Sequence, residues 1–243
     1  MKETLLTVLE NTRLADGIYR LRLAGDTSAI TAPGQFVNLK LSGFFLRRPI
    51  SVCDWENGEV TLIYKVLGHG TEAMTGMAAG TALDVLTGLG NGFDLSRSGE
   101  HPLVGGGVGI PPLYGLAKRL TAQGKRVTAV LGFNRKSEIF LAEEFRALGA
   151  EVVIATADGS VGLKGLVTDG MAAVSDYTYL YTCGPEPMLK AVYADCKTSG
   201  QFSFEERMGC GFGACMGCSC ETKYGNKRIC KDGPVLEKEE IVW

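Results

Sequence analysis

The chain of 243 residues lacks the features that would direct it to a membrane, to nucleic acid or to an oxidising compartment. No apolar run approaches the roughly 20 residues that span a bilayer, because glycine or charge interrupts the longest ones. Twenty-five basic residues nearly balance 27 acidic ones, so the net charge of -2 gives no reason to expect nucleic-acid binding. The N-terminal MKETLLTVLE has neither the basic nor the apolar region of a signal peptide, which favours a cytoplasmic protein with reduced thiols.

Histidine is also scarce, because the chain has only His69 and His101, and both lie far from the cysteine-rich segment. Five of the eight cysteines crowd into residues 210–230. Disulfides between them are disfavoured by the expected reducing compartment. Structural zinc usually needs a second C-x2-C pair or a pair of histidines, and neither is present near these cysteines.

The spacing of the cysteines favours an iron–sulfur cluster. Cys210, Cys215 and Cys218 form C-x4-C-x2-C, and Cys230 follows a short polar loop, which suits a [2Fe-2S] cluster held by four thiolates. The glycines between them let the backbone turn tightly and aim N–H groups at the sulfurs. We interpret Cys220 as a small buried residue and not as a ligand. Because such a cluster moves single electrons, the sequence predicts a redox relay.

The first hundred residues have the pattern of short antiparallel strands. Apolar and polar residues alternate over 19–24 and 60–66, and turn signals such as Pro33-Gly34 and Asn57-Gly58 separate the strands. This spacing predicts an antiparallel β-barrel.

After about Gly99 the pattern changes to alternating strands and helices, which predicts a doubly wound parallel α/β sheet. The expected strands are 127–133, 152–155 and 177–181, and the expected helices are 112–123, 138–148 and 186–197. We therefore expect three domains: a barrel at 1–98, an α/β domain at 99–201 and a small cysteine module at 202–243.

Two short motifs in the barrel region could bind phosphate. Arg48-Pro49-Ile50-Ser51 ends a strand, where the planar fork of an arginine matches diphosphate oxygens, although alone it also fits ordinary turn chemistry. Gly68-His69-Gly70-Thr71 precedes a helix expected near 73–77. Its N–H groups could bind phosphate, and Thr71 could equally cap the helix.

Two further motifs lie in the α/β region. Gly105-Gly106-Gly107-Val108-Gly109 follows a strand and opens a helix, a context in which a dinucleotide pyrophosphate sits on the helix N-terminus. Ile110 stands where the usual G-x-G-x-x-G has its last glycine, and no acidic residue ends the next strand to bind a ribose. Cys183-Gly184-Pro185 ends a later strand, at the edge of the sheet where ligands bind, although Cys183 alone would fit a buried structural thiol.

Together and in this order, these motifs resemble the ferredoxin–NADP reductase superfamily. The segments LRRPIS, GHGT, GLGNGF, VGGGVGIPPL, TCGPEPML and GCGFGACMGC…RICKDGP are similar, within it, to the electron-transfer subunits of dihydroorotate dehydrogenase B. This resemblance covers essentially the whole chain. It implies an NAD-dependent flavin and iron–sulfur oxidoreductase with a flavin-binding barrel, a nucleotide domain and a C-terminal [2Fe-2S] module.

The resemblance also assigns residues to cofactors. FAD would be bound by Arg48, Pro49, Ile50, Ser51, Ile63, Tyr64, Lys65, Gly70 and Thr71. NAD would be bound by Gly105, Gly106, Gly107, Val108, Gly109, Gly184 and Pro185, with Cys183 as the catalytic residue near the hydride path. The cluster would be bound by Cys210, Cys215, Cys218 and Cys230.

In the function that this resemblance implies, electrons pass from a dihydroorotate-oxidising FMN subunit through the cluster and FAD to NAD⁺, in pyrimidine biosynthesis. The partner would be that FMN-containing catalytic subunit, in a heterotetramer with two copies of each chain. One alternative is an FAD/[2Fe-2S] NAD(P)H oxidoreductase subunit that serves another partner, such as ferredoxin. A second is a non-catalytic scaffold with structural zinc, which would be colourless.

The sequence departs from the superfamily pattern in its aromatic residues. Many relatives have an aromatic at the position of Ile50, which stacks on the flavin. The chain also lacks a terminal aromatic placed directly after the nucleotide domain, and Trp243, which follows the cysteine module, has no assigned role.

Overall fold

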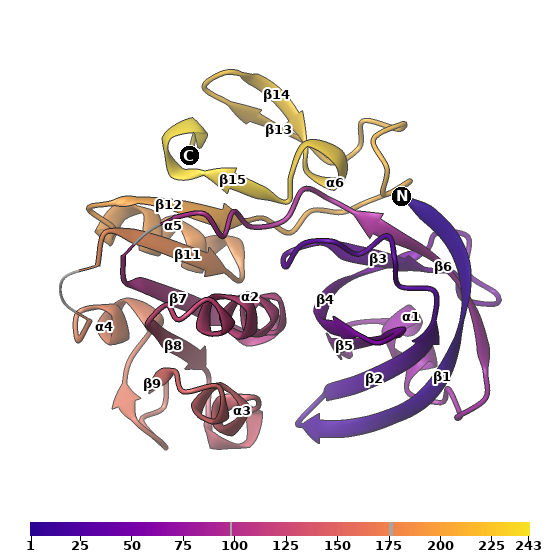
Figure 1. Cartoon of the computed structure of the whole chain (residues 1–243), viewed down its shortest axis with the longest axis horizontal. Coiled ribbons are helices and arrows are strands. Elements are labelled where there is room, and N and C mark those ends of the chain that lie inside the picture. Colours follow the sequence, from indigo (N-terminus) through magenta and orange to yellow (C-terminus); the bar gives the residue numbers. More distant parts are fainter. Residues whose placement is uncertain (98, 175–176) are drawn as a thin grey trace.

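The computed structural model describes residues 1–97, 99–174 and 177–243, and its first part is a closed six-stranded barrel (Figure 1). Its strands, in the order β1-β2-β5-β4-β3-β6, are all antiparallel to their neighbours. They are β1 (Lys2–Ala15), β2 (Ile18–Gly25), β3 (Phe36–Leu39), β4 (Arg48–Glu56), β5 (Glu59–Lys65) and β6 (Ala82–Leu89). The predicted barrel is confirmed, because alternating residues such as Leu21 and Leu23 fill its interior.

The second part is a seven-stranded sheet in the order β10-β9-β8-β7-β11-β12-β15. Its strands are β7 (His101–Gly106), β8 (Val127–Phe133), β9 (Glu151–Thr156), β10 (Leu163–Lys164), β11 (Tyr179–Cys183), β12 (Ser199–Ser203) and β15 (Val235–Glu237). The first six are parallel, and β15 is antiparallel to β12. No helix among the described residues is long and apolar enough to cross a membrane.

Helices cover both faces of this sheet, so the predicted doubly wound fold is confirmed. The long helices are α2 (Ile110–Ala122) and α5 (Glu186–Asp195), and the shorter ones are α1 (His69–Met74), α3 (Ala142–Ala147), α4 (Val167–Met171) and α6 (Ile229–Asp232). Helices α2 and α3 pack in one apolar cluster, and α4 and α5 pack in another. The chain order reverses between β7 and β11, and such a switch point is where open α/β sheets bind ligands.

Two predicted helices differ from the structure. The helix expected at 138–148 is shorter, because Leu141 has a left-handed backbone with φ 63° and only Ala142–Ala147 follow as helix. Helix α1 begins at His69 rather than near residue 73, so it contains Gly70 and Thr71. The strand expected at 177–181 spans Tyr179–Cys183, and it therefore ends on Cys183 itself.

The barrel and the sheet are held together mainly through α2 and β4. A Cβ on Gly115 would lie 2.4 Å from the backbone oxygen of Cys53, so the helix and the strand touch directly. The Arg119 guanidinium lies 3.4 Å from the Trp55 ring centroid, and Lys118 forms an ion pair with Asp54 at 2.7 Å. This close contact fixes the barrel against the sheet.

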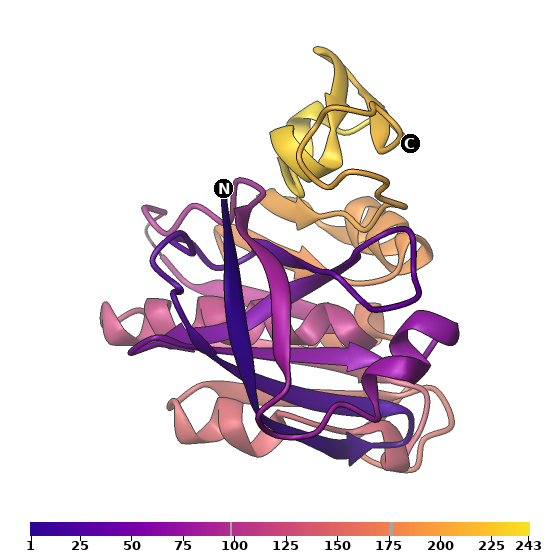
Figure 2. The same cartoon turned by 90° about the vertical axis from the view of Figure 1, so that its right-hand side faces the viewer.

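The C-terminal segment forms a separate layer beside the barrel and the sheet. It contains the hairpin β13 (Ser219–Thr222) and β14 (Gly225–Arg228), which projects from the body of the molecule (Figure 2). It then returns through α6 to β15 at the edge of the sheet. Strand β12 runs across the expected boundary between 201 and 202. Parts of the chain on both sides of that boundary therefore share one sheet.

Candidate cofactor cleft and cysteine loop

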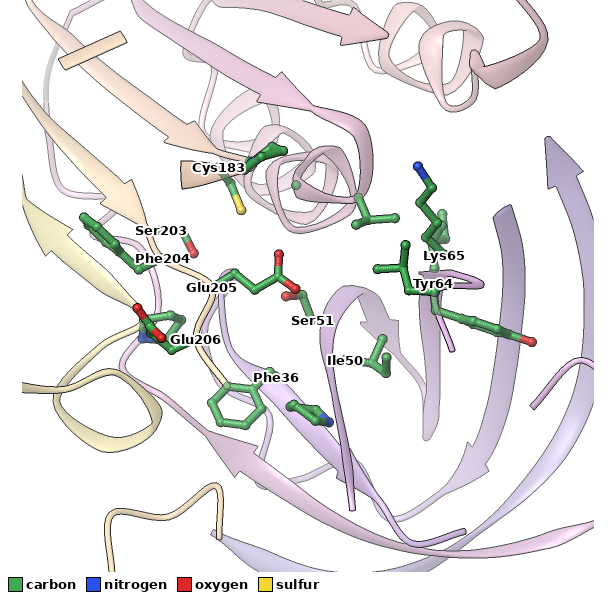
Figure 3. A pocket seen from close by; sticks show the side chains of 18 of the residues that line it. Phe36, Ile50, Ser51, Tyr64, Lys65, Cys183, Ser203, Phe204, Glu205 and Glu206 are labelled. Carbon is green, nitrogen blue, oxygen red and sulfur yellow. The ribbon is translucent and has the colours of Figure 1, made fainter. Parts of the chain in front are cut away.

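A cleft of about 210 Å³ lies where the barrel meets the carboxyl ends of β7 and β11 (Figure 3). Thirteen of the predicted site residues line it, and they come from both parts of the fold. They are Pro49, Ile50, Ser51, Ile63, Tyr64, Lys65, Thr71, Gly106, Val108, Gly109, Cys183, Gly184 and Pro185. The structure thus brings the predicted flavin motif and the predicted nicotinamide motif to the same cavity.

Four other predicted residues do not line this cleft: Arg48, Gly70, Gly105 and Gly107. The Arg48 side chain lies directly over Gly70, since a Cβ on Gly70 would meet its Nε at 2.1 Å. A larger residue at position 70 would therefore displace the Arg48 side chain. This contact joins the two barrel motifs into one positively charged corner, which suits a diphosphate.

Thr71 acts as a local cap. Its hydroxyl oxygen accepts hydrogen bonds from the backbone N–H groups of Leu67 at 2.9 Å and Gly68 at 3.2 Å. It also donates to the Gly68 carbonyl at 3.0 Å. Thr71 therefore caps the start of helix α1, and it orders the turn that carries Gly70.

Tyr64 lines the cleft with its backbone rather than its ring. The ring points away from the cleft (Figure 3) and stacks on Tyr19, with centroids 5.7 Å apart. Its hydroxyl hydrogen-bonds Asn11 Oδ1 at 3.2 Å, and burial raises the pKa of Tyr64 to about 12. Strand β5 therefore presents peptide groups to the cleft at this position, while neighbouring Lys65 supplies a charged side chain.

The glycine loop and the C-G-P motif pack against each other. A Cβ on Gly109 would lie 2.2 Å from the carbonyl oxygen of Cys183. Met188 fills the space beside Gly106 and Gly184, because a Cβ on either glycine would come within 2.5 Å of its side chain. Ile110, which replaces the last glycine of the usual motif, is fully buried in the core under α2. The isoleucine in place of the last motif glycine therefore contributes to the hydrophobic core.

The Cys183 side chain points into the cleft, as do those of Ser51 and Glu205 (Figure 3). Burial raises the pKa of Cys183 to about 12, and the Glu205 carboxylate contributes to this rise. A hydrogen bond with Ser203 acts in the opposite direction. At neutral pH Cys183 is an uncharged thiol, which suits a nonpolar contact beside a hydride path and not a base or a nucleophile.

The sequence does not predict one segment that lines the cleft, in addition to the barrel and the ends of β7 and β11. Ser203, Phe204, Glu205, Glu206 and Met208 line the cavity, together with Phe36 and Pro234. An internal aromatic residue, Phe204, comes immediately after β12 at the end of the nucleotide-binding sheet. Trp243 stacks on Phe204 with centroids 5.4 Å apart. The run F-S-F-E-E just before the cysteines was the available signal.

We define residues 209–217 as the cluster loop. Of the four predicted cluster ligands, Cys210 and Cys215 lie in this loop, Cys218 lies just before β13, and Cys230 lies on α6. No three His, Cys, Asp or Glu side chains converge on one metal-binding point within 1–97, 99–174 and 177–243. The thiols instead interact in two pairs, Cys210 with Cys215 and Cys218 with Cys230. Two protein ligands on each of two irons is the arrangement that a [2Fe-2S] cluster requires, so the residues fit that group.

Backbone N–H groups surround the first of these sulfurs. Those of Ala214 and Cys215 lie 3.3 and 3.5 Å from Cys210 Sγ. Although burial acts to raise it, these groups, with Phe212 N–H and the Cys215 thiol, lower the pKa of Cys210 to about 6. In the second pair, the N–H of Cys230 lies 3.4 Å from Cys218 Sγ. Such donors stabilise thiolates and are typical of cluster-binding loops.

Comparisons with known proteins agree with this arrangement. A model of the oxidoreductase NAD-binding domain matches residues 103–194, and a model of the iron-sulfur cluster binding domain of dihydroorotate dehydrogenase B matches residues 205–242. A protein of Shouchella clausii named dihydroorotate dehydrogenase B (NAD(+)), electron transfer subunit, is 44% identical over 99% of this chain and 98% of its own length. One of the same name from Fusobacterium nucleatum is 41% identical over 97% and 96%.

The chain belongs to this family of electron transfer subunits. The predicted oxidoreductase class and the predicted cofactors, FAD, a [2Fe-2S] cluster and NAD, are thereby confirmed. A solved structure of the NADH-dependent reduced ferredoxin-NADP oxidoreductase matches with a TM-score of 0.91 and 30% identity, over 99% of this chain and 90% of that one. The ferredoxin NADP+ reductase of Neisseria gonorrhoeae, at 16% identity and a TM-score of 0.70 over 80% and 90%, shares the fold.

Proposed function

We propose that this chain is the electron-transfer subunit that receives electrons from an FMN-containing, dihydroorotate-oxidising subunit and delivers them to NAD⁺ in the cytoplasm, in pyrimidine biosynthesis. The two subunits form a heterotetramer with two copies of each. The observation that carries this proposal is the single cleft in which the barrel motif and the C-G-P motif face each other, beside the cluster loop. FAD exchanges both single electrons and hydrides, so it connects a one-electron cluster to a nicotinamide.

The residues divide among three tasks under this proposal. Arg48, Pro49, Ile50, Ser51, Ile63, Tyr64, Lys65, Gly70 and Thr71 hold FAD, and Gly105, Gly106, Gly107, Val108, Gly109, Cys183, Gly184 and Pro185 hold NAD. Cys210, Cys215, Cys218 and Cys230 hold the cluster. The corresponding domains are 1–98, 99–201 and 202–243, with the third attached to the second through β12 and β15. We expect no acid–base residue for dihydroorotate in this chain, because that chemistry would belong to the partner.

The first test is NADH formation from dihydroorotate under anaerobic conditions, with this protein mixed with its candidate FMN subunit. We expect turnover only when both proteins are present, with FMN in the partner subunit and FAD and the iron–sulfur cluster in this chain. Absorbance at the NADH band provides the measurement. No NADH from a mixture shown to contain all three cofactors would contradict the pyrimidine assignment.

A second candidate function deserves the same assay, because the ferredoxin-NADP oxidoreductase structure is similar over nearly the whole chain. In that function the chain exchanges electrons with ferredoxin instead of a dihydroorotate-oxidising subunit. Replacing the FMN subunit with reduced ferredoxin in the assay separates the two. NADH formation with ferredoxin alone would favour the second function.

Replacing Cys183 with alanine is expected to slow hydride transfer between flavin and nicotinamide by about tenfold, or ~1.4 kcal/mol in the barrier. The thiol fills the cleft wall beside Gly109, and its loss leaves space in which the nicotinamide is less well aligned. Stopped-flow measurement of flavin reduction by NADH gives the rate. FAD and iron contents should stay at wild-type values.

Cys53 provides the matched control for this substitution, because it is also buried but lies at the contact between β4 and α2, away from the cleft lining. Cys53→Ala should leave the hydride-transfer rate within about twofold of wild type while removing the same thiol volume. Equal rates for Cys183→Ala and the wild type would remove Cys183 from the catalytic assignment.

A further inference from the structure

Asn38 is a buried polar residue at the contact between the barrel and the cluster loop. Strand β3 alternates, so Val37 and Leu39 fill the barrel interior while Phe36 faces the C-terminal segment. By the same alternation Asn38 points outward, yet it is only 1% exposed because the cluster loop covers it. It is therefore a polar side chain enclosed between two parts of the fold.

The amide group of Asn38 makes one specific contact with this loop. Its Nδ2 donates a hydrogen bond to the backbone carbonyl of Cys210 at 3.3 Å. It also packs on Gly211, where a Cβ would lie 2.4 Å from Nδ2 and where the backbone has φ +81°. The loop thus turns at a glycine over Asn38, and its first cysteine is tied to the barrel by that side chain.

Stability alone does not explain an asparagine at this position. Its Oδ1 is buried and has no hydrogen-bond partner among the described residues. Such an unsatisfied acceptor costs about 1–3 kcal/mol. A leucine of similar shape would avoid this cost and pack with the neighbouring apolar residues. The polar group is therefore kept for the contact that it makes.

That contact controls the geometry of the donors around the Cys210 sulfur. Fixing the carbonyl of Cys210 and the turn at Gly211 determines where the following N–H groups point. Those of Ala214 and Cys215 converge on Cys210 Sγ. N–H groups directed at a cluster sulfur favour the reduced, more negative state, so their alignment raises the reduction potential.

We propose that Asn38 is a positioning residue that anchors the cluster loop to the barrel and thereby sets the reduction potential of the cluster. This inference rests on the proposed function, in which Cys210 is a cluster ligand. Asn38 also pairs with Pro49 across β3 and β4, so the same residue connects the loop to the strand that carries the predicted flavin motif. One side chain thus fixes the position of the cluster loop relative to that motif.

The test is Asn38→Leu in the cofactor-loaded full chain, measured by redox titration with electron paramagnetic resonance of the reduced cluster. We expect the ratio of reduced to oxidised cluster at a fixed potential to fall about tenfold. For a one-electron couple this corresponds to a downward shift of about 59 mV. The line shape of the resonance should also change. FAD content should equal that of wild type, and the melting temperature should stay close to it, because the substitution removes both the unpaired Oδ1 and the hydrogen bond to Cys210.

Thr87→Val is the matched control. Thr87 is another fully buried polar residue on the neighbouring strand β6, but its hydroxyl bonds the Lys2 carbonyl and faces the barrel interior. It should leave the cluster potential unchanged. If Asn38→Leu does not hold its cluster, Asn38→Ala removes the same donor with space for a water, and the same downward shift is expected.

The outcomes separate this inference from the function on which it rests. A wild-type protein that shows no [2Fe-2S] resonance after loading would overturn the proposed function and the inference together. A normal wild-type resonance with an unchanged potential and line shape in the Asn38 variants would overturn the positioning role alone.

Discussion

Replacing Cys215 with serine is expected to abolish dihydroorotate-dependent NADH formation while leaving flavin chemistry intact. Changes to groups that only support metal ligands already cost 10–100-fold, so removing a ligand should lower turnover by at least about 100-fold. Cys215 is the most suitable of the four cysteines because it is exposed, and its loss disturbs no core packing. Iron analysis, the visible spectrum and turnover with the FMN subunit measure the effect.

The cofactor cleft, where the barrel meets the carboxyl ends of β7 and β11, should continue to work in this variant. NADH-driven reduction of a two-electron dye uses only the flavin and nicotinamide motifs, so its rate should stay within about twofold of wild type. Cys220→Ser is the control, because Cys220 lies on β13 in the same module and is half-buried, but it belongs to neither thiol pair. Full iron content and turnover in Cys215→Ser would contradict its assignment as a ligand.

The parts of the fold that depend on local pattern could be predicted from the sequence. In the barrel, a two-residue period places Leu21 and Leu23 inside regardless of what surrounds the strand. Strand β8 was expected at its observed limits, since its apolar run lies between a turn and a polar loop. The motifs could also be assigned to strand ends, and this is enough to place them on one edge of the sheet.

The parts that depend on tertiary pairing could not be predicted. Strand β12 is five residues long and contains a glycine and polar residues, so its strand conformation comes from pairing with β11 and β15. Because the local pattern does not predict β12, it also does not place Phe204 at the end of the sheet. The predicted helix at 138–148 is longer than the observed one for a similar reason. Its apolar pattern continues across Leu141, where the backbone is left-handed.

The candidate site shows the same division. Chemistry that resides in a short motif, such as the cysteine spacing or the C-G-P sequence, could be read from residue types alone. Contacts between motifs could not be predicted in this way. Arg48 comes close to Gly70, and Asn38 to Cys210, only after the chain folds. The glycines of the 105–109 loop illustrate this, since the sequence does not say which of them is needed for conformation and which for space.

Replacing Gly109 with alanine is expected to remove productive nicotinamide binding, raising the KM for NADH by at least about 100-fold, or ~2.7 kcal/mol. Gly109 has a right-handed backbone with φ -78°, which alanine adopts without strain. The methyl group, however, would lie 2.2 Å from the Cys183 carbonyl oxygen and 2.5 Å from the Gly184 nitrogen. Both are backbone atoms, so the glycine loop and the C-G-P motif must separate. Steady-state kinetics with a two-electron dye measures the change.

Gly107→Ala separates the effect of space from that of conformation. Gly107 has φ +52°, a left-handed value that costs alanine about 1–2 kcal/mol, but a Cβ there would meet nothing within 4 Å. It should therefore lower the melting temperature slightly and change the KM for NADH only a few-fold. FAD and iron contents of both variants show whether the remaining sites are intact. If Gly107→Ala loses NADH binding as severely as Gly109→Ala, loop conformation controls the site. Direct contact between the two motifs would then not be its basis.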